Sequence, residues 1–254
     1  MNNSPDPYAD RDSYRALHTA ADLKYYRIRV EETDLHIGTR GEFRAEALAL
    51  TIRARHMVEE AIAARPRFAT TLSPLEPHGS EPPLILEMLQ AGKDAAVGPM
   101  AAVAGAIAAF VGRGLRELSP CGIVENGGDL FLWGDTPRTV AVFAGSSPLS
   151  GLIGLRVVPG PEGCSVCTSS GTVGHSLSLG QADAAVILSD SAALADAAAT
   201  ALGNFCPDSA EPEEALDRAM AIPGVKGALV ILGETLAMKG QLEPVPLSGL
   251  RTNL

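Results

Sequence analysis

An alanine-rich stretch, residues 189–204, carries one carboxylate in its middle, Asp196. On a helix, Thr200 and Asn204 share a face with Asp196, because they follow it at intervals of four residues. Ser191 and its neighbours supply an N-cap, so Asp196 is too far into the helix to act as one. Solvent exposure would explain the acid without any function. The alternative is a hard divalent cation, Mg²⁺ or Ca²⁺, held by Asp196, the Thr200 hydroxyl and backbone carbonyls.

A second candidate is the sequence ENGGDL at residues 125–130, which lies between two apolar segments. Asn-Gly and Gly-Gly supply the positive φ angles of a tight hairpin turn. A glycine turn also exposes backbone N–H groups that can face a phosphate. We therefore expect a hairpin turn here and hypothesise that it binds a ligand through Asn126, Gly127, Gly128 and Asp129.

The segment 163–183 is dense in hydroxyl groups and glycines, and we expect it to be a binding loop. Five consecutive residues in it could offer an anion several short donors without net charge. These are Thr168, Ser169, Ser170, Gly171 and Thr172. The alternative is a flexible Ser/Gly-rich loop that binds nothing.

The same segment contains a histidine and two cysteines. His175 could be a general acid or base near neutral pH, or a structural histidine. Cys164 and Cys167 form a C-x-x-C pair, which is typical of a redox couple or of half a zinc site. A zinc site of four cysteines would require Cys121 and Cys206 to converge on this pair, so we favour a reactive Cys167 thiolate beside the hydroxyls.

Composition limits the class of protein. The chain has 254 residues, 46% of them hydrophobic, which is enough apolar material for one or two cores. Aromatic residues make up only 4%, so small side chains must pack closely. The formal net charge of −10 would repel a nucleic acid backbone, and we expect no nucleic acid partner.

Two segments are candidates for a secretory signal or a membrane span, residues 1–20 and the run 95–112. Residues 1–20 carry acids and prolines where a secretory signal would be basic and then apolar, so we expect a flexible tail and a cytoplasmic protein. The uncharged run 95–112 is long enough to span a bilayer. Its alanines and glycines favour insertion only weakly and Pro99 interrupts it, so we expect a buried helix and no membrane partner.

Periodicity predicts one α+β domain over residues 21–254, with mostly antiparallel sheets packed against helices. Helices are expected at 42–65, 84–91, 98–118, 189–204 and 211–221, with an extended proline-rich crossing at 66–83. Strands are expected at 25–39 as a pair, and at 121–126, 129–134, 138–145, 151–158, 184–189, 225–232 and 234–240, before a last short segment. The strands between 121 and 158 should pair as a meander, and close approach is expected at Gly105 and Gly112.

Three motifs occur in the order seen in the ApbE-like superfamily, whose best-known members are FAD:protein FMN transferases. They are NGGD at 126–129, TSSG at 168–171 and ADAAAT at 195–200. VGPMAAVAGAIA at 97–108 and CTSSGTVGHSLSLGQADAAV at 167–186 resemble more closely a smaller ApbE-related branch found in archaea and anaerobic bacteria.

The resemblance implies a T-fold-related architecture and a site for FAD or FMN. It also implies that Asp196 and Thr200 match the metal-binding Asp and Thr of the superfamily, with a carbonyl near Ala101 as a further ligand. Two features of the transferases are replaced. Ala104-Gly105 stands where they carry Lys-Gly, and His175-Ser-Leu-Ser stands where they carry His-Ile-x-Asp-Pro. If the protein is an enzyme, the resemblance implies a transferase, but these replacements argue against the flavin transfer of those relatives.

Two classes of function remain open. The first is an enzyme acting on a small anionic metabolite, such as a flavin, a nucleotide or a phosphorylated or sulfur-bearing compound. The branch it resembles implies sulfur assimilation to homocysteine, in which Cys167 would carry sulfur and His175 would assist its deprotonation. The second is a non-catalytic flavin- or metal-binding carrier that serves a partner protein, and a homo-oligomer is also open.

Overall fold

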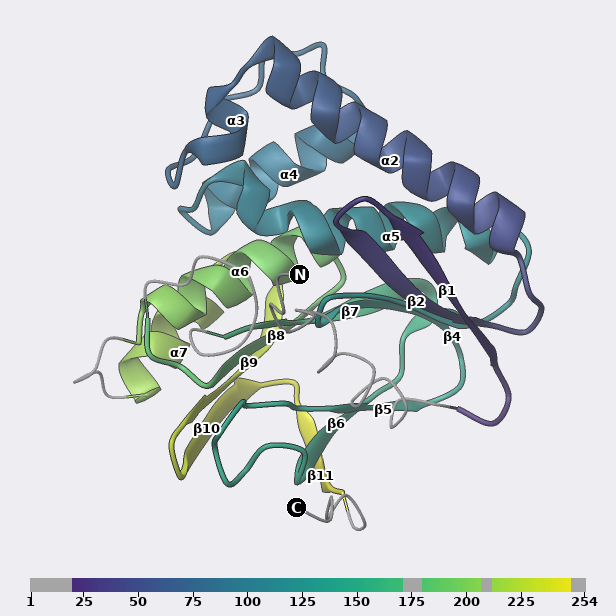
Figure 1. Ribbon diagram of the computed structural model, residues 1–254. Helices are drawn as coiled ribbons and strands as arrows, with labels where there is room; N and C mark the ends of the chain where they lie inside the picture. Colours follow the sequence, from purple (N-terminus) through teal and green to yellow (C-terminus); the bar gives the residue numbers. More distant parts are fainter. Residues whose placement is uncertain (1–19, 171–179, 207–211, 248–254) are drawn as a thin grey trace, which may run out of the picture.

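The computed structural model describes residues 20–170, 180–206 and 212–247, which form two β-sheets and a layer of helices (Figure 1). The large sheet contains β1 (Lys24–Val30), β2 (Thr33–Thr39), β3 (Gly122–Asn126), β4 (Asp129–Gly134), β7 (Gly160–Ser169), β8 (Ala184–Ser189), β9 (Val225–Leu232) and β10 (Thr235–Gly240). The small sheet contains β5 (Arg138–Ala141), β6 (Ile153–Val157) and β11 (Glu243–Pro246). The helices are α2 (Arg44–Ala64), α3 (Arg67–Thr70), α4 (Pro83–Asp94), the 3₁₀ turn η1 (Pro99–Ala102), α5 (Val103–Arg116), α6 (Ala192–Asn204) and α7 (Pro212–Met220).

The large sheet has eight strands in the order β1-β2-β3-β4-β7-β8-β9-β10, and the small sheet has the order β11-β6-β5. Every neighbouring pair is antiparallel. The expected α+β class with mostly antiparallel sheets is therefore confirmed. The chain leaves the large sheet after β4 to build β5 and β6, so the segments between 121 and 158 do not form the single meander that we expected.

Each face of the large sheet packs against a different layer. In β4, Phe131 and Trp133 belong to the core shared with α5 and α6, whereas Leu130 and Leu132 belong to the core shared with the small sheet. This alternation follows from the two-residue period of a strand. The two cores consequently lie on opposite faces of one sheet.

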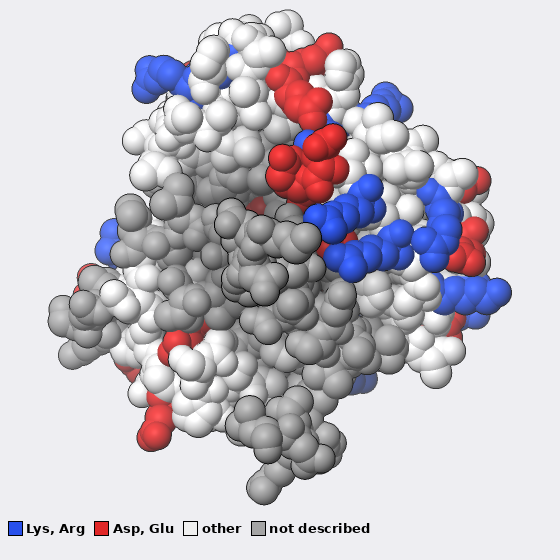
Figure 2. Space-filling model, viewed as in Figure 1, with Lys and Arg blue, Asp and Glu red and all other residues white. Residues whose placement is uncertain are grey.

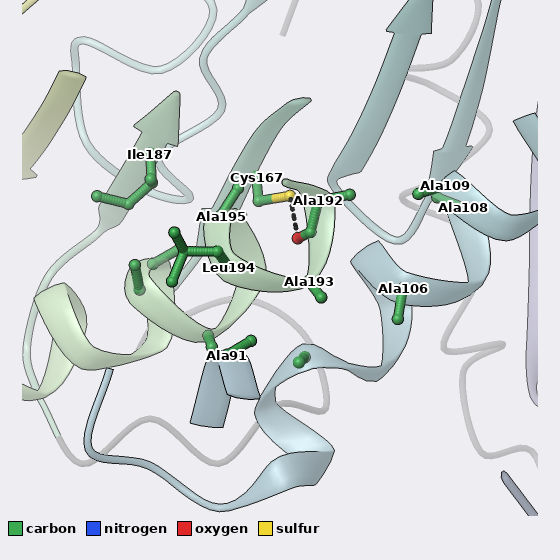
Figure 3. Close-up of a cluster of buried hydrophobic side chains, with 14 of the residues drawn as sticks. Ala91, Ala106, Ala108, Ala109, Cys167, Ile187, Ala192, Ala193, Leu194 and Ala195 are labelled. Atoms are coloured by element: carbon green, nitrogen blue, oxygen red, sulfur yellow. Dashed lines mark hydrogen bonds between the residues drawn. The ribbon is translucent and has the colours of Figure 1, made fainter. Parts of the chain in front are cut away.

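Small residues let the helices approach closely, as the low aromatic content required. A Cβ atom added to Gly105 would lie 2.4 Å from the carbonyl oxygen of Ala192, and one added to Gly112 would lie 2.3 Å from Phe131 Cδ1. The expected close approach at both glycines is confirmed. Figure 3 shows the alanines of α5 and α6 that fill the space between these helices and the sheet.

Three predicted segments differ from the structure. The helix expected over 98–118 begins as η1, and α5 proper starts at Val103. The crossing at 66–83 contains the short helix α3. Residues 160–169, assigned in part to a loop, form the ten-residue strand β7, because Val, Thr and Cys side chains fit a half-buried sheet and the alternation outweighs the loop-like composition.

In the described part of the chain, no single helix is long and apolar enough to cross a membrane. The pair made by α4 and residues 99–116 meets the length and composition criteria together, but the two parts bend by 110°. The uncharged run at 95–112 is thus divided between a connection, η1 and α5.

Candidate functional site

One cleft of about 1490 Å³ brings together the segments singled out in the sequence. Its lining includes residues 126–129 of the glycine turn, Thr168, Ser169 and Ser170 at the end of β7, and Ala101 of η1. It also includes the three polar residues of one face of α6, Asp196, Thr200 and Asn204. Gly171, Thr172 and His175 lie outside the described residues.

The glycine turn is the tight hairpin that the sequence predicted. Asn126 pairs with Asp129 across β3 and β4, and Gly127 and Gly128 have φ angles of 67° and 106°. A residue with a side chain rarely adopts either angle. The turn packs against β7, because a Cβ atom added to Gly128 would lie 3.6 Å from the Thr168 carbonyl oxygen.

Asp196 is held by the first turn of α5. Its Oδ2 atom accepts a hydrogen bond from the Gly105 N–H at 2.8 Å, and the Ala104 N–H also donates to the carboxylate. Both N–H groups belong to the start of a helix, where intrahelical acceptors are missing. Asp196 therefore caps a neighbouring helix, which gives the acid in the alanine-rich helix a structural reason. Its own helix is capped by Ser191, which accepts from the Leu194 N–H at 3.3 Å.

The glycine turn is also held by the first turn of α5. Asn126 Nδ2 donates to the Ala104 carbonyl at 3.1 Å. Ala104 thus holds the glycine turn with its carbonyl and Asp196 with its N–H. This explains how two motifs that are about seventy residues apart in sequence become fixed relative to each other.

Asp129 lines the cleft and is 6% exposed. Burial and the nearby charge of Asp196 raise its pKa well above the usual range, although hydrogen bonds from the Cys167 thiol and the Thr168 N–H oppose this shift. Its Oδ1 atom has no hydrogen-bond partner in the part of the chain that the structure describes. Burial also raises the pKa of Asp196, to about 7.

The structure corrects the interpretation of the cysteines. Cys164 belongs to the core facing the small sheet and Cys167 to the core facing the helices, because an interval of three residues places them on opposite faces of β7. They cannot form the redox couple or zinc half-site that we considered. No group of three His, Cys, Asp or Glu residues in the described ranges could hold a metal.

Cys167 is a buried thiol in this arrangement and is absent from the residues that line the cleft. Its Sγ atom lies 3.7 Å from the Ala192 carbonyl oxygen (Figure 3). Burial first, and then the charges of Asp129 and Asp196, raise its pKa well above the ordinary value. A protonated, enclosed thiol is a poor nucleophile.

The charges around the cleft are unbalanced. Among the described residues, the lining contains two arginines, Arg55 and Arg138, and each is paired with an acid. The acidic residues of the lining are Glu32, Glu59, Glu125, Asp129 and Asp196. In the view of Figure 2, acidic and basic side chains lie next to one another above and to the right of the grey residues. An anion would therefore meet no unpaired Lys or Arg among these residues.

The donor atoms near Asp196 suit a hard cation. The Asp196 carboxylate, the Thr200 hydroxyl and the Ala101 carbonyl offer only oxygen, which Mg²⁺ and Ca²⁺ prefer. The orphaned Oδ1 of Asp129 and the raised pKa values are what two neighbouring carboxylates show without a counter-charge. The residues present thus fit a divalent cation at this end of the cleft.

A family model described as "AbpE bacteria" matches residues 15–238. The chain belongs to this family. The UPF0280 protein of Methanocella arvoryzae is 40% identical over 223 residues, which cover 87% of this chain and 91% of that protein. A UPF0280 protein of Methanosarcina barkeri is 41% identical over 225 residues, covering 87% and 88% of the two chains.

Solved structures share the fold of this family member. The apo form of the flavinyl transferase ApbE from Pseudomonas stutzeri has a TM-score of 0.57 at 13% identity, over 86% of this chain and 94% of that one. The flavin transferase ApbE from Vibrio cholerae has a TM-score of 0.58 at 12% identity, over 90% and 98%. The ApbE-like architecture expected from the motifs is confirmed.

The cleft of this family member also contains residues that the sequence reasoning missed. We call them the strand-side arm, defined as Tyr25, His36, Ile123, Arg138 and Val140, all of which line the cleft. We call the part around Ala101, Asp196 and Thr200 the helix-side arm. Tyr25, His36 and Ile123 alternate with the core residues of β1, β2 and β3, and that alternation was the one sequence signal that pointed to them.

Proposed function

We propose that this protein binds a flavin nucleotide, FAD or FMN, together with Mg²⁺ or Ca²⁺ in the described cleft. The observation that carries the proposal is the convergence of the glycine turn, the end of β7 and Asp196 on one acid-lined end of a large cleft. A phosphate placed there would face Asp129 and Asp196 without an unpaired cationic side chain among the described residues. A divalent cation resolves that conflict.

Residues of the cleft could supply both the ligands of the cation and the hydrogen-bond donors to the phosphate. Asp196, Thr200 and the Ala101 carbonyl would hold the cation, which when bound neutralises phosphate charge. The Ser169 side chain lies on the same face of β7 as Cys167, and its hydroxyl, which has no hydrogen-bond partner in the described ranges, can donate to a phosphate oxygen. The Gly128 N–H is not available for this purpose, since it donates to Glu125 Oε1 at 2.9 Å.

Binding without transfer is the first candidate, and transfer of the phosphate-bearing part of the ligand is the second. Ala104 brings no positive charge to the helix-side arm, and a transferred phosphoryl group needs such charge. In favour of transfer, burial raises the pKa of Asp129, a carboxyl of the cleft that the cation site does not use, so Asp129 could take up or give a proton. We do not extend the proposal to sulfur transfer, because the Cys167 thiol is buried and protonated.

Ligand-dependent thermal stability tests binding. FAD or FMN with Mg²⁺ should raise the Tm of the protein, since a ligand present at 100 times its Kd stabilises by about 2.7 kcal/mol. EDTA, or the variant Asp196→Asn, should remove most of that increase. Asp190→Asn is the matched control, because Asp190 is an exposed partner of Lys226 at the surface. An equal response to FAD in D196N and in the unchanged protein would contradict the cation site.

Product analysis separates the two candidates. The protein is incubated with FAD and Mg²⁺, and the nucleotides are separated by chromatography. Intact FAD together with a large Tm increase identifies a binding protein. Release of AMP that depends on Mg²⁺ and is lost in D196N identifies cleavage of the pyrophosphate. Absence of any flavin-dependent Tm change would overturn the proposed function.

A further inference from the structure

We propose that the strand-side arm is a ring-binding subsite, in which Tyr25 and His36 form a stacking surface for a planar heteroaromatic ring. The inference deepens the proposed function by assigning the ring and the phosphates of one ligand to opposite arms of the cleft. It rests on the proposed function only for the identity of that ring as a flavin.

The aromatic pair has the geometry of a platform. The Tyr25 and His36 rings have centroids 5.0 Å apart with an interplanar angle of 31°, and both residues are half-buried in the cleft wall. Aromatic rings at such distances attract each other, and a further ring can stack on the parts of the two rings that line the cleft. A base stacked on an aromatic side chain is held without regard to its charge.

A glycine opposite Tyr25 makes the platform possible. Tyr25 pairs with Gly38 across β1 and β2, and a Cβ atom added to Gly38 would lie 2.6 Å from Tyr25 Cε1. The ring therefore lies over the strand at a position where any other residue would lift it. The Tyr25 hydroxyl accepts a hydrogen bond from the Ala20 N–H at 3.1 Å, which fixes the ring at its far end.

The walls of the strand-side arm suit a ring better than a phosphate. Ile123 and Val140 are apolar, and the Arg138 guanidinium is neutralised by bidentate hydrogen bonds to Asp22 at 2.6 and 2.9 Å. The remaining donor of Arg138, Nε, is buried and has no partner in the described part of the chain. A carbonyl or ring nitrogen in the plane of a heteroaromatic ligand would satisfy it, since an unmet buried donor is costly.

The size of the cleft supports a ligand with two parts. Its volume of about 1490 Å³ exceeds the range of roughly 300–1,000 Å³ that holds most small ligands. The lining passes from the helix face of the sheet, at Asp196, to the opposite face, at Ile123 and Val140. A ligand with a ring at one end and phosphates at the other would fill both arms.

Flavin binding to Tyr25 variants tests this assignment. Riboflavin, which has the ring without phosphate, and FMN are titrated while flavin fluorescence is followed, and pyrophosphate with Mg²⁺ is measured in parallel by thermal shift. Tyr25→Leu should weaken riboflavin and FMN binding roughly tenfold and reduce the quenching of flavin fluorescence. Tyr25→Phe should restore both, and the pyrophosphate response should be the same in all three proteins.

A second variant, which leaves Tyr25 in place, controls for any structural damage that Y25L causes. Ile123 on β3 is partly buried and belongs to the same arm, so Ile123→Trp should obstruct the ring while leaving the response to pyrophosphate unchanged. Unchanged FMN and riboflavin affinity in both Y25L and I123W would overturn the subsite while leaving the proposed function intact. Absence of flavin binding by the unchanged protein would overturn the proposed function, and the flavin subsite with it.

Discussion

The Asp196 carboxylate has two roles: it caps α5 and it lines the cleft. Its Oδ2 atom accepts the Gly105 N–H, while the residue lines the cleft beside Thr200. The cap holds the acid in place, so a cation would find at least one ligand already positioned. The energetic cost of burying the acid is visible in its pKa, which burial raises to about 7.

This shift predicts how stability depends on pH. The pKa of Asp196 is about 7 in the folded protein and near 3.8 in an unfolded chain, so between these values the folded protein retains a proton that the unfolded chain has lost. The free energy of unfolding should therefore fall as pH rises from about 4 to about 7 in the absence of divalent cations. Thermal melting over this range, in the presence of EDTA, measures it.

The pKa of Asp129 is also raised in the folded protein. The variant D196N should therefore reduce the pH dependence of the free energy of unfolding without abolishing it. Mg²⁺ should stabilise the unchanged protein more at pH 8 than at pH 5, because a cation binds the ionised carboxylate. Stabilisation by Mg²⁺ that is larger at pH 5 would contradict the assignment of Asp196 as a ligand.

The cysteines give a second prediction at the residue scale. All four are free and buried, and burial raises the pKa of Cys164 to about 11. We expect the native protein to react with a thiol reagent such as DTNB much more slowly than the protein unfolded in guanidinium chloride. Cys167→Ala should bind flavin as the unchanged protein does. Rapid labelling of Cys167 under native conditions would revive the sulfur-carrier hypothesis.

At the scale of elements, the first turn of α5 organises the helix-side arm. Ala104 and Gly105 donate to Asp196 of α6, and the Ala104 carbonyl accepts from Asn126 at the end of β3. η1 enters the same turn and carries Ala101 into the cleft. One helical turn thus sets the distances among three segments, and a change that moves α5 away from α6 should disturb them all.

Gly105→Ala tests this organisation. The new Cβ atom would lie 2.4 Å from the Ala192 carbonyl oxygen and 2.9 Å from Asp196 Cβ, so α5 and α6 must separate. We expect a loss of stability of about 1–3 kcal/mol by urea denaturation, together with weaker Mg²⁺-dependent stabilisation. Gly114→Ala in the same helix is the control, because its Cβ atom would meet the mobile end of the Leu50 side chain. Equal losses in the two variants would contradict the role of Gly105.

At the scale of the whole molecule, the large sheet is shared by two cores and by both arms of the cleft. Its helix face packs on α5 and α6, and its other face packs on β5 and β6 of the small sheet. The cleft connects these two sides near the glycine turn, which lies at the joint of β3 and β4. Neither layer can move without altering the cleft.

The shared sheet predicts cooperative unfolding, as expected for one domain. Calorimetry should show a single transition, with equal calorimetric and van't Hoff enthalpies. A flavin with Mg²⁺ should move that transition as a unit. Two separate transitions, of which only one responds to ligand, would show that the small sheet and the helices unfold independently.

Local patterns were sufficient for most elements. Alternation and glycine placement predicted β1, β2 and the turn between β3 and β4, and the four-residue spacing predicted that Asp196, Thr200 and Asn204 would share a face. Local patterns did not predict the strand β7, because its hydroxyl-rich composition suggested a loop. Whether a Ser or Thr lies in a strand or a loop depends on the neighbouring strands, here β4 and β8, and the sequence of β7 alone does not contain them.

The sequence by itself determined the family motifs, the small-residue packing and the faces of individual elements, because these depend on neighbours along the chain. Only the tertiary structure decided that Asp196 caps α5, that Cys164 and Cys167 face different cores, and that Tyr25 lines the same cleft as Asp196. Each of these facts depends on contacts between residues far apart in sequence. Such contacts arise from the packing of whole layers, and no local pattern encodes them.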